Sequence, residues 1–159
     1  MIASETTLMR RKEKEITNKK EIESIIRKSA VCRLAMAEKE TPYVVPLCFG
    51  YDRNTLFFHS ATEGKKLDIL RKNNSVCVEF DTDHEILNNE KACRWGMRYA
   101  SVIAFGKASF VEYPDEKRKA LDLIMRQYSD AAFHYSDEDL SKISIIRVTL
   151  ELMTGKRSY

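Results

Sequence analysis

The chain has 159 residues, of which 43% are hydrophobic and 32% are charged, and its formal net charge is +3 at pH 7. This is the composition of one soluble globular domain, and it excludes an intrinsically disordered chain. No apolar stretch approaches the ~20 residues of a membrane span and no basic surplus favours polyanions, so we expect neither a membrane nor a nucleic acid as a partner.

The beginning of the chain and the cysteines bear on the cellular compartment. The opening MIASETTLMRRKEKE has no apolar stretch after basic residues, so no secretory signal is expected. The four cysteines are widely spaced and form no CxxC pair: Cys32, Cys48, Cys77 and Cys93. We therefore expect reduced thiols and a cytoplasmic location.

Apolar periodicity divides the first half of the chain into two helices around a meander of strands. Asn18, with Glu21 three residues later, predicts a helix start before the isoleucines of 22–26. Runs rich in β-branched and aromatic residues predict strands over 30–37, 42–49 and 55–59. Their short connections require antiparallel pairing. A helical spacing of leucines predicts a second helix over 62–72.

The second half continues the pattern with long strands. Strands are expected over 75–80, 99–111 and 143–152, with a polar loop over 81–91. Gly106 predicts a bulge or a bend, Pro114 opens a helix, and Ser136 caps a further turn. The pattern indicates a mainly β protein with a few helices, an antiparallel split or closed barrel of six strands. We expect one domain over 1–159, with an N-terminal arm over 1–17 and a polar tail over 153–159.

The stretch LFFHSATEGKKLDIL, residues 56–70, carries the strongest chemical signal. A strand leads through His59 and Ser60 into a turn with Gly64, and Lys65 and Lys66 then open a helix. Lysines at a helix N-terminus oppose the dipole, whereas the free N–H groups there favour an anion. A phosphate between the lysines and the N–H groups would reconcile the two. The alternative is a pair of solvated lysines.

A second cluster precedes the long strand, in CRWGMRYASV, residues 93–102. Trp95, Arg98 and Tyr99 could stack on a planar ligand and pair with an acidic one, or could close the barrel or form a subunit contact. The sequence contains no glycine-rich nucleotide motif. The acidic residues around His84 suit a solvated loop better than a metal site, so no metal is expected.

The motifs PYVVPLCFGY, LFFHSATEGKKLDIL, VCVEFD and CRWGMRYASVIAFGKASFVEYP together resemble the FMN-binding split-barrel family of pyridoxamine 5'-phosphate oxidase. They are most similar to the branch that includes the nitroimidazole-resistance (Nim) proteins. The resemblance implies a six-stranded split barrel and a homodimer with FMN in clefts at the subunit interface. The chain ends TGKRSY and lacks the arginine motif with which the oxidase holds pyridoxal phosphate, which argues against that activity.

The resemblance also assigns the cofactor-binding residues. Lys65 and Lys66 would hold the FMN phosphate. The remaining residues would lie along the ring, the ribityl chain or the partner subunit: Val44, Val45, Pro46, Phe58, His59, Ser60, Trp95, Arg98 and Ser101.

We therefore expect an FMN-dependent oxidoreductase that reduces a small electron-poor molecule, such as a nitroaromatic compound. His59 is the candidate catalytic residue, because an imidazole exchanges protons near neutral pH. The alternative roles are a non-catalytic flavin-binding or redox-sensing module, or a barrel that holds haem, another flavin or a deazaflavin.

Overall fold

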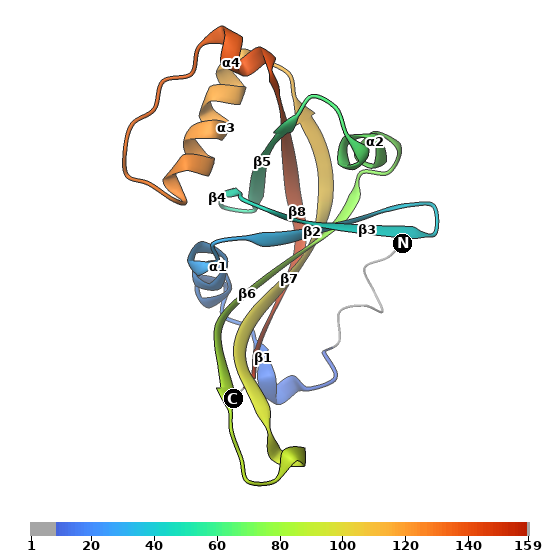
Figure 1. The fold of residues 1–159 in the computed structure, drawn as a ribbon, viewed down its shortest axis with the longest axis vertical. Helices are drawn as coiled ribbons and strands as arrows, with labels where there is room; N and C mark the ends of the chain where they lie inside the picture. Colours follow the sequence, from blue (N-terminus) through green and yellow to red (C-terminus); the bar gives the residue numbers. More distant parts are fainter. Residues whose placement is uncertain (1–8, 159) are drawn as a thin grey trace.

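The computed structural model describes residues 9–158, which form one antiparallel sheet of eight strands with helices around it (Figure 1). The strand order is β3-β2-β6-β7-β8-β5-β4, and β1 pairs with β8 outside this path. The strands are β1 (Glu15–Ile16), β2 (Cys32–Glu38), β3 (Thr41–Leu47), β4 (Gly50–Asp52), β5 (Thr55–Ala61), β6 (Ser75–Leu87), β7 (Gly96–Val111) and β8 (Ile143–Ser158). The α-helices are α1 (Lys19–Lys28), α2 (Lys65–Lys72), α3 (Pro114–Arg126) and α4 (Asp137–Ser141).

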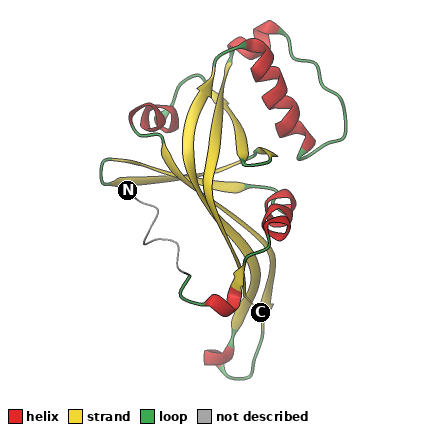
Figure 2. Cartoon of the chain, turned by 180° about the vertical axis from the view of Figure 1, so that it is seen from behind, coloured by secondary structure: helices red, strands yellow, loops and turns green. Residues whose placement is uncertain are grey.

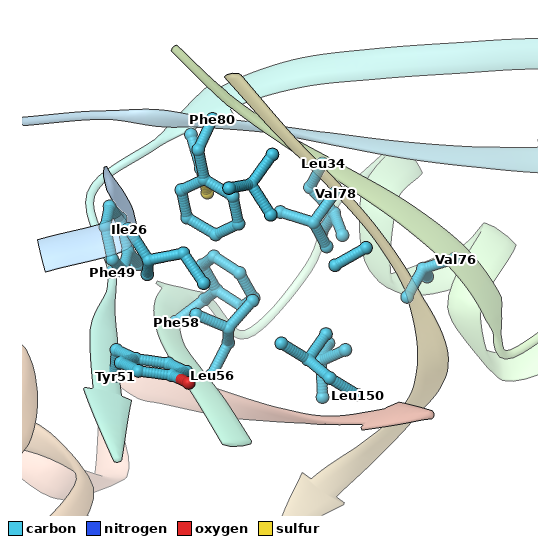
Figure 3. Close-up of a cluster of buried hydrophobic side chains, with 14 of the residues drawn as sticks. Ile26, Leu34, Phe49, Tyr51, Leu56, Phe58, Val76, Val78, Phe80 and Leu150 are labelled. Carbon is cyan, nitrogen blue, oxygen red and sulfur yellow. The ribbon is translucent and has the colours of Figure 1, made fainter. Parts of the chain in front are cut away.

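The sheet curls around a single main core, as Figure 3 shows. Alternate residues of the strands point inward, so the buried positions recur with the period of two that a half-buried strand requires. Phe49 and Phe80 meet edge to face at the centre, with ring centroids 5.2 Å apart. Leu34, Phe58 and Val78 are fully buried beside them. This core fixes which face of each strand is available to a ligand.

The helices cover the open parts of the barrel (Figure 2). The side chain of Asn18 caps α1 by accepting a hydrogen bond from the Lys20 N–H at 2.9 Å, which confirms the predicted helix start. Helix α3 lies directly on Gly50, where a Cβ atom would come within 2.5 Å of the Ile124 nitrogen. No helix within residues 9–158 is long and apolar enough to cross a membrane.

The mainly β split-barrel fold is confirmed, but two of the predicted boundaries are wrong and the strands number eight rather than six. The two additional strands, β1 and β4, have 2 and 3 residues. Strands this short carry too little periodicity to be recognised in a sequence. They exist because β8 and β5 offer them unpaired backbone edges.

The predicted loop over 81–91 is largely strand, because β6 continues to Leu87. Its acidic residues are matched by basic neighbours: Asp81 pairs with Arg33, Asp83 with Lys28 and Glu85 with Arg98. The irregularity expected from such a polar run is confined to a bulge between Thr82 and Glu85. Strand pairing therefore outweighs the local polarity here.

The predicted polar tail over 153–159 is also strand as far as Ser158. This segment pairs with β7 on one side, where Val102 is the partner of Gly155. On the other side it pairs with β1, where Ile16 is the partner of Gly155. The predicted bulge at Gly106 is confirmed by a register shift between Phe105 and Gly106. A Cβ atom at Gly106 would lie 2.2 Å from the Thr149 carbonyl oxygen, so only glycine fits.

The residues that follow α3 tie it to the rest of the molecule. The Tyr128 hydroxyl donates to the Ala30 carbonyl at 2.9 Å and accepts from the Phe49 N–H at 3.0 Å. Beside it, the Gln127 amide donates to the carbonyls of Arg27 and Ser29. Burial of the hydroxyl raises the pKa of Tyr128 to about 12, so the phenol keeps the proton that it donates.

Substituting Tyr128→Phe should lower the free energy of unfolding by about 1–3 kcal/mol, because it leaves both backbone groups without a partner. Chemical denaturation of the variant and the wild type measures this difference. Tyr113→Phe is the matched control, since the Tyr113 side chain is 71% exposed. An equal effect of the two substitutions would contradict the role of the hydroxyl.

Candidate functional site

The candidate site lies where β5 passes into α2. The strand ends at Ala61, and a short turn leads through Gly64 to Lys65, the first residue of the helix. Gly64 has a φ of 134°, a conformation that residues with a side chain rarely adopt, and a Cβ atom there would meet nothing within 4 Å. Backbone conformation, rather than space, therefore explains the glycine.

The N-terminus of α2 has no side-chain cap. Gly64 precedes the helix, and its carbonyl oxygen accepts from the N–H groups of Leu67 and Asp68 at 2.9 and 3.2 Å. The N–H groups of the first turn thus lack the serine, threonine, aspartate or asparagine oxygen that normally satisfies them. Such an end is suited to an anionic group.

Lys66 adds a positive charge that nothing in the described part of the chain neutralises. Its side chain is half-buried, and burial lowers the pKa of its ammonium group with no carboxylate to oppose the effect. Within residues 9–158 it makes no hydrogen bond or ion pair. A half-buried, uncompensated cation is costly unless a ligand supplies the opposite charge.

A cleft of about 360 Å³ lies against these lysines. On one side are residues of β3, and on the other are the end of β5, the turn and the start of α2. The lining residues are Tyr43, Val45, Pro46, Leu47, Ser60, Glu63, Gly64, Lys65, Lys66 and Leu67. Five of the residues predicted for cofactor binding are thus brought together: Val45, Pro46, Ser60, Lys65 and Lys66.

Three of the residues predicted on β3 and β5 do not line the cleft. Val44 is not part of the cleft lining and is 58% exposed, on the opposite face of β3 from Val45. The Phe58 side chain is fully buried in the core. His59 is exposed, pairs with Ile145 of β8, and lies on the opposite face of β5 from Ser60.

The remaining predicted residues lie on β7 or just before it, away from the cleft. Trp95 is 55% exposed near the tip of the β6–β7 hairpin, where its indole N–H donates to the Asn89 carbonyl at 2.6 Å. Arg98 pairs with Glu85 at 2.8 Å in the same hairpin. Ser101 lies opposite Asp81 and Lys156 in the sheet. The tip of this hairpin is at the bottom of the molecule in Figures 1 and 2, whereas α2 lies at the side of the upper half.

Tyr43 and Glu63 are cleft residues that the sequence analysis missed. Tyr43 directly precedes the predicted pair Val44 and Val45 in PYVVP, and the strand period of two places it on the same side as Val45. Applying that period to β3 would have identified Tyr43, although Pro46, which alternates with Val45 as Val44 does, also lines the cleft. Glu63 gave no signal beyond its position in the turn.

The acidic residues around His84 do not form a metal site. Within residues 9–158, no group of three or more histidine, cysteine, aspartate or glutamate side chains could hold a metal ion. The His84 Nε2 atom lies 2.8 Å from Asp81, whose carboxylate also pairs with Arg33. This cluster is an ion-pair network on the sheet.

Comparison with known proteins identifies the family. The family model described as pyridoxamine 5'-phosphate oxidase matches residues 18–157. The comparison with curated proteins gives no match. Among solved structures, a candidate 5-nitroimidazole antibiotic resistance protein from Bacteroides thetaiotaomicron is 40% identical, with 90% of this chain and 86% of that chain covered and a TM-score of 0.82.

Two more distant structures share the fold. The FAD and heme binding protein from Mycobacterium smegmatis is 17% identical, with a TM-score of 0.83 over 91% of this chain and 73% of that one. The flavocytochrome Anf3 from Azotobacter vinelandii is 12% identical, with a TM-score of 0.86 over 98% and 75%. The family model and the 40% identical structure show that the chain belongs to the pyridoxamine 5'-phosphate oxidase family, as its sequence motifs predict.

Proposed function

We propose that the protein binds FMN, with the phosphate held at the N-terminus of α2, and uses it to reduce a small electron-poor molecule. The observation that carries this proposal is the half-buried charge of Lys66, which faces a cleft and has no partner within residues 9–158. A terminal phosphate would neutralise that charge and accept from the unsatisfied N–H groups of α2. Ser60 lines the same cleft and offers a hydroxyl donor.

The cleft suits the rest of FMN as well. Val45, Pro46 and Leu47 give it one apolar wall, against which a flavin ring system can pack, while the polar groups gather at the α2 end. Membership of a family whose solved relatives include FAD- and haem-binding proteins supports a redox cofactor here. When bound, FMN supplies the electron and hydride chemistry, and the protein supplies binding and orientation.

A nitroaromatic substrate is favoured by the 40% identical structure, which is described as a candidate 5-nitroimidazole antibiotic resistance protein. We assign proton transfer to His59, whose exposed imidazole makes no hydrogen bond within the described residues. Because His59 and Ser60 lie on opposite faces of β5, His59 must act on a substrate at the open end of the cleft or in a second copy of the chain.

A non-catalytic flavin-binding or redox-sensing module is the second candidate. The placement of His59 favours this second candidate, because His59 does not line the cleft. Among the described residues, the ionisable groups that do are those of Tyr43, Glu63, Lys65 and Lys66. Turnover separates the two functions. Purified protein loaded with FMN should oxidise NADH or NADPH in the presence of a 5-nitroimidazole if it is an enzyme, and should not if it is a binding module.

We also propose that the protein is a homodimer. One row of the sheet brings Val44, Ala35, Cys77, Phe105 and Leu152 side by side across five strands, and Ile103 lies in the next row. We call this row together with Ile103 the outer sheet face. The side chains of Val44 and Ile103 are 58% and 42% exposed, so this face presents apolar surface to solvent. Pairing with a second copy would bury it.

A dimer would also explain the predicted residues that lie far from the cleft. Trp95, Arg98 and Ser101 do not line the cleft of their own chain. Ser101 and Ile103 point to the same face of β7, so a partner packed on the outer sheet face would lie against Ser101. We propose that these three residues serve the cofactor of the partner.

Substituting Lys66→Met should weaken FMN binding at least about tenfold, because the phosphate loses one charge-assisted contact. Binding of riboflavin, which lacks the phosphate, should not change. Titration of flavin fluorescence measures both affinities, and Lys119→Met, on the exposed surface of α3, is the matched control. An unchanged FMN affinity would refute the phosphate site.

Substituting Ile103→Glu should convert the dimer to a monomer, because it places a charge on the apolar surface that the partner buries. Light scattering at micromolar concentration measures the mass. Tyr113→Glu, on an exposed residue at the start of α3, should leave the dimer intact. A wild-type protein that is monomeric with FMN bound would contradict the proposal.

Substituting His59→Ala should lower the rate of nitroimidazole reduction by about 10²-fold or more, because the proton donor is lost. FMN affinity should change much less, since the residue lies outside the phosphate site. Steady-state kinetics and flavin titration on the same preparation separate the effects. Equal losses in rate and in affinity would show that His59 only holds the cofactor.

A further inference from the structure

The two lysines at the start of α2 are held in different ways. Lys66 is half-buried and without a partner in residues 9–158, whereas the ammonium group of exposed Lys65 lies 4.8 Å from the centre of the Tyr43 ring. At this distance the positive charge is attracted to the electron-rich face of the ring. The contact joins the first turn of α2 to β3, on the opposite wall of the cleft.

The ring of Tyr43 is well placed to act as a fixed support. Tyr43 pairs with Met36 of β2, and its side chain packs against the main core together with Val45 and Leu47. A lysine side chain, by contrast, has four rotatable carbon–carbon bonds and loses much rotamer entropy when it is held in place. The packed ring therefore restricts Lys65, and not the reverse.

The other basic residues of α2 show why an aromatic support matters. Lys72 pairs with Glu38 and Arg71 with Asp68, so the charges at the C-terminal end of the helix are matched by carboxylates. A carboxylate beside Lys65 would hold it equally well but would cancel its charge. The Tyr43 ring restrains the ammonium group without forming an ion pair. The hydrogen bond from Lys72 lowers the pKa of the Glu38 carboxyl, and the charge of Lys65 adds to this effect. That carboxylate pairs with Lys72, so Lys65 keeps its charge for an anion.

We propose that Tyr43 is a positioning residue that holds Lys65 ready for the phosphate group of the ligand and so favours a phosphorylated flavin over an unphosphorylated one. The inference rests on the proposed function of the cleft as an FMN site. Tyr43 acts through Lys65, so its effect should depend on the phosphate and on the lysine.

The experiment is a double-mutant cycle read with two ligands. FMN and riboflavin are titrated into the wild type and into the variants Tyr43→Leu, Tyr43→Phe, Lys65→Met and Tyr43→Leu with Lys65→Met. Lys66→Met is included as an independent test of the phosphate site, and thermal unfolding checks that each variant is folded. Tyr43→Phe keeps the ring and loses only the hydroxyl.

Tyr43→Leu should weaken FMN binding by about two- to fivefold and leave riboflavin binding unchanged, as expected for a cation–π contact near the surface. Tyr43→Phe should bind FMN like the wild type, and Tyr43→Leu should have no further effect once Lys65 is replaced by methionine.

An equal loss of FMN and riboflavin affinity in Tyr43→Leu would overturn the inference, as would a loss that persists in the Lys65→Met background or that Tyr43→Phe shares. If Tyr43→Leu has no effect but Lys66→Met weakens FMN binding, only the role of Tyr43 fails. If Lys66→Met leaves the preference for FMN intact, the phosphate site fails and the role of Tyr43 fails with it.

Discussion

The uncompensated charge of Lys66 at the start of α2 is the constraint on which the account of this protein depends. A half-buried ammonium group beside an uncapped helix N-terminus is unfavourable in the free protein, because neither the cation nor the N–H groups of Lys65 and Lys66 have a partner within the described chain. This cost falls at the cleft between β3 and α2, which Lys66 lines. An anionic ligand removes it, and the phosphate of a flavin fits both the charge and the apolar wall.

The barrel explains how this site is held in position. Strand β5 is paired to β8 over seven residues, from Thr55 to Ala61, so the turn that follows it begins from a fixed point. At the other end of α2, the Asn73 side chain donates to the Ala37 carbonyl and Lys72 pairs with Glu38, both on β2. These contacts tie the end of α2 to β2, which pairs with β3, the other wall of the cleft.

Local sequence patterns predicted the parts of the fold and site that depend on neighbouring residues. The strand, the glycine turn and the paired lysines lie within LFFHSATEGKKLDIL, so Ser60, Lys65 and Lys66 could be placed together from the sequence. The family resemblance added Val45 and Pro46, which lie on a distant strand. Val44 and Phe58 do not line the cleft: Val44 lies on the opposite face of β3 from Val45, and Phe58, on the same face of β5 as Ser60, is buried in the core.

The rest depends on pairing between distant segments. Nothing in the sequence of 81–87 shows that Arg33, Lys28 and Arg98 neutralise its acidic residues and allow β6 to continue. Likewise, β1 and the end of β8 become strands only because they pair with each other and with β7. Trp95 lies away from the cleft because the β6–β7 hairpin, near whose tip it is found, is long.

The most direct test of the central claim is the visible absorption spectrum of the purified protein, followed by denaturation and identification of any chromophore released. If FMN occupies the cleft, the spectrum should be that of a flavin, and denaturation should release FMN in an amount equimolar with the chain. A colourless protein that also fails to bind added FMN would contradict that claim.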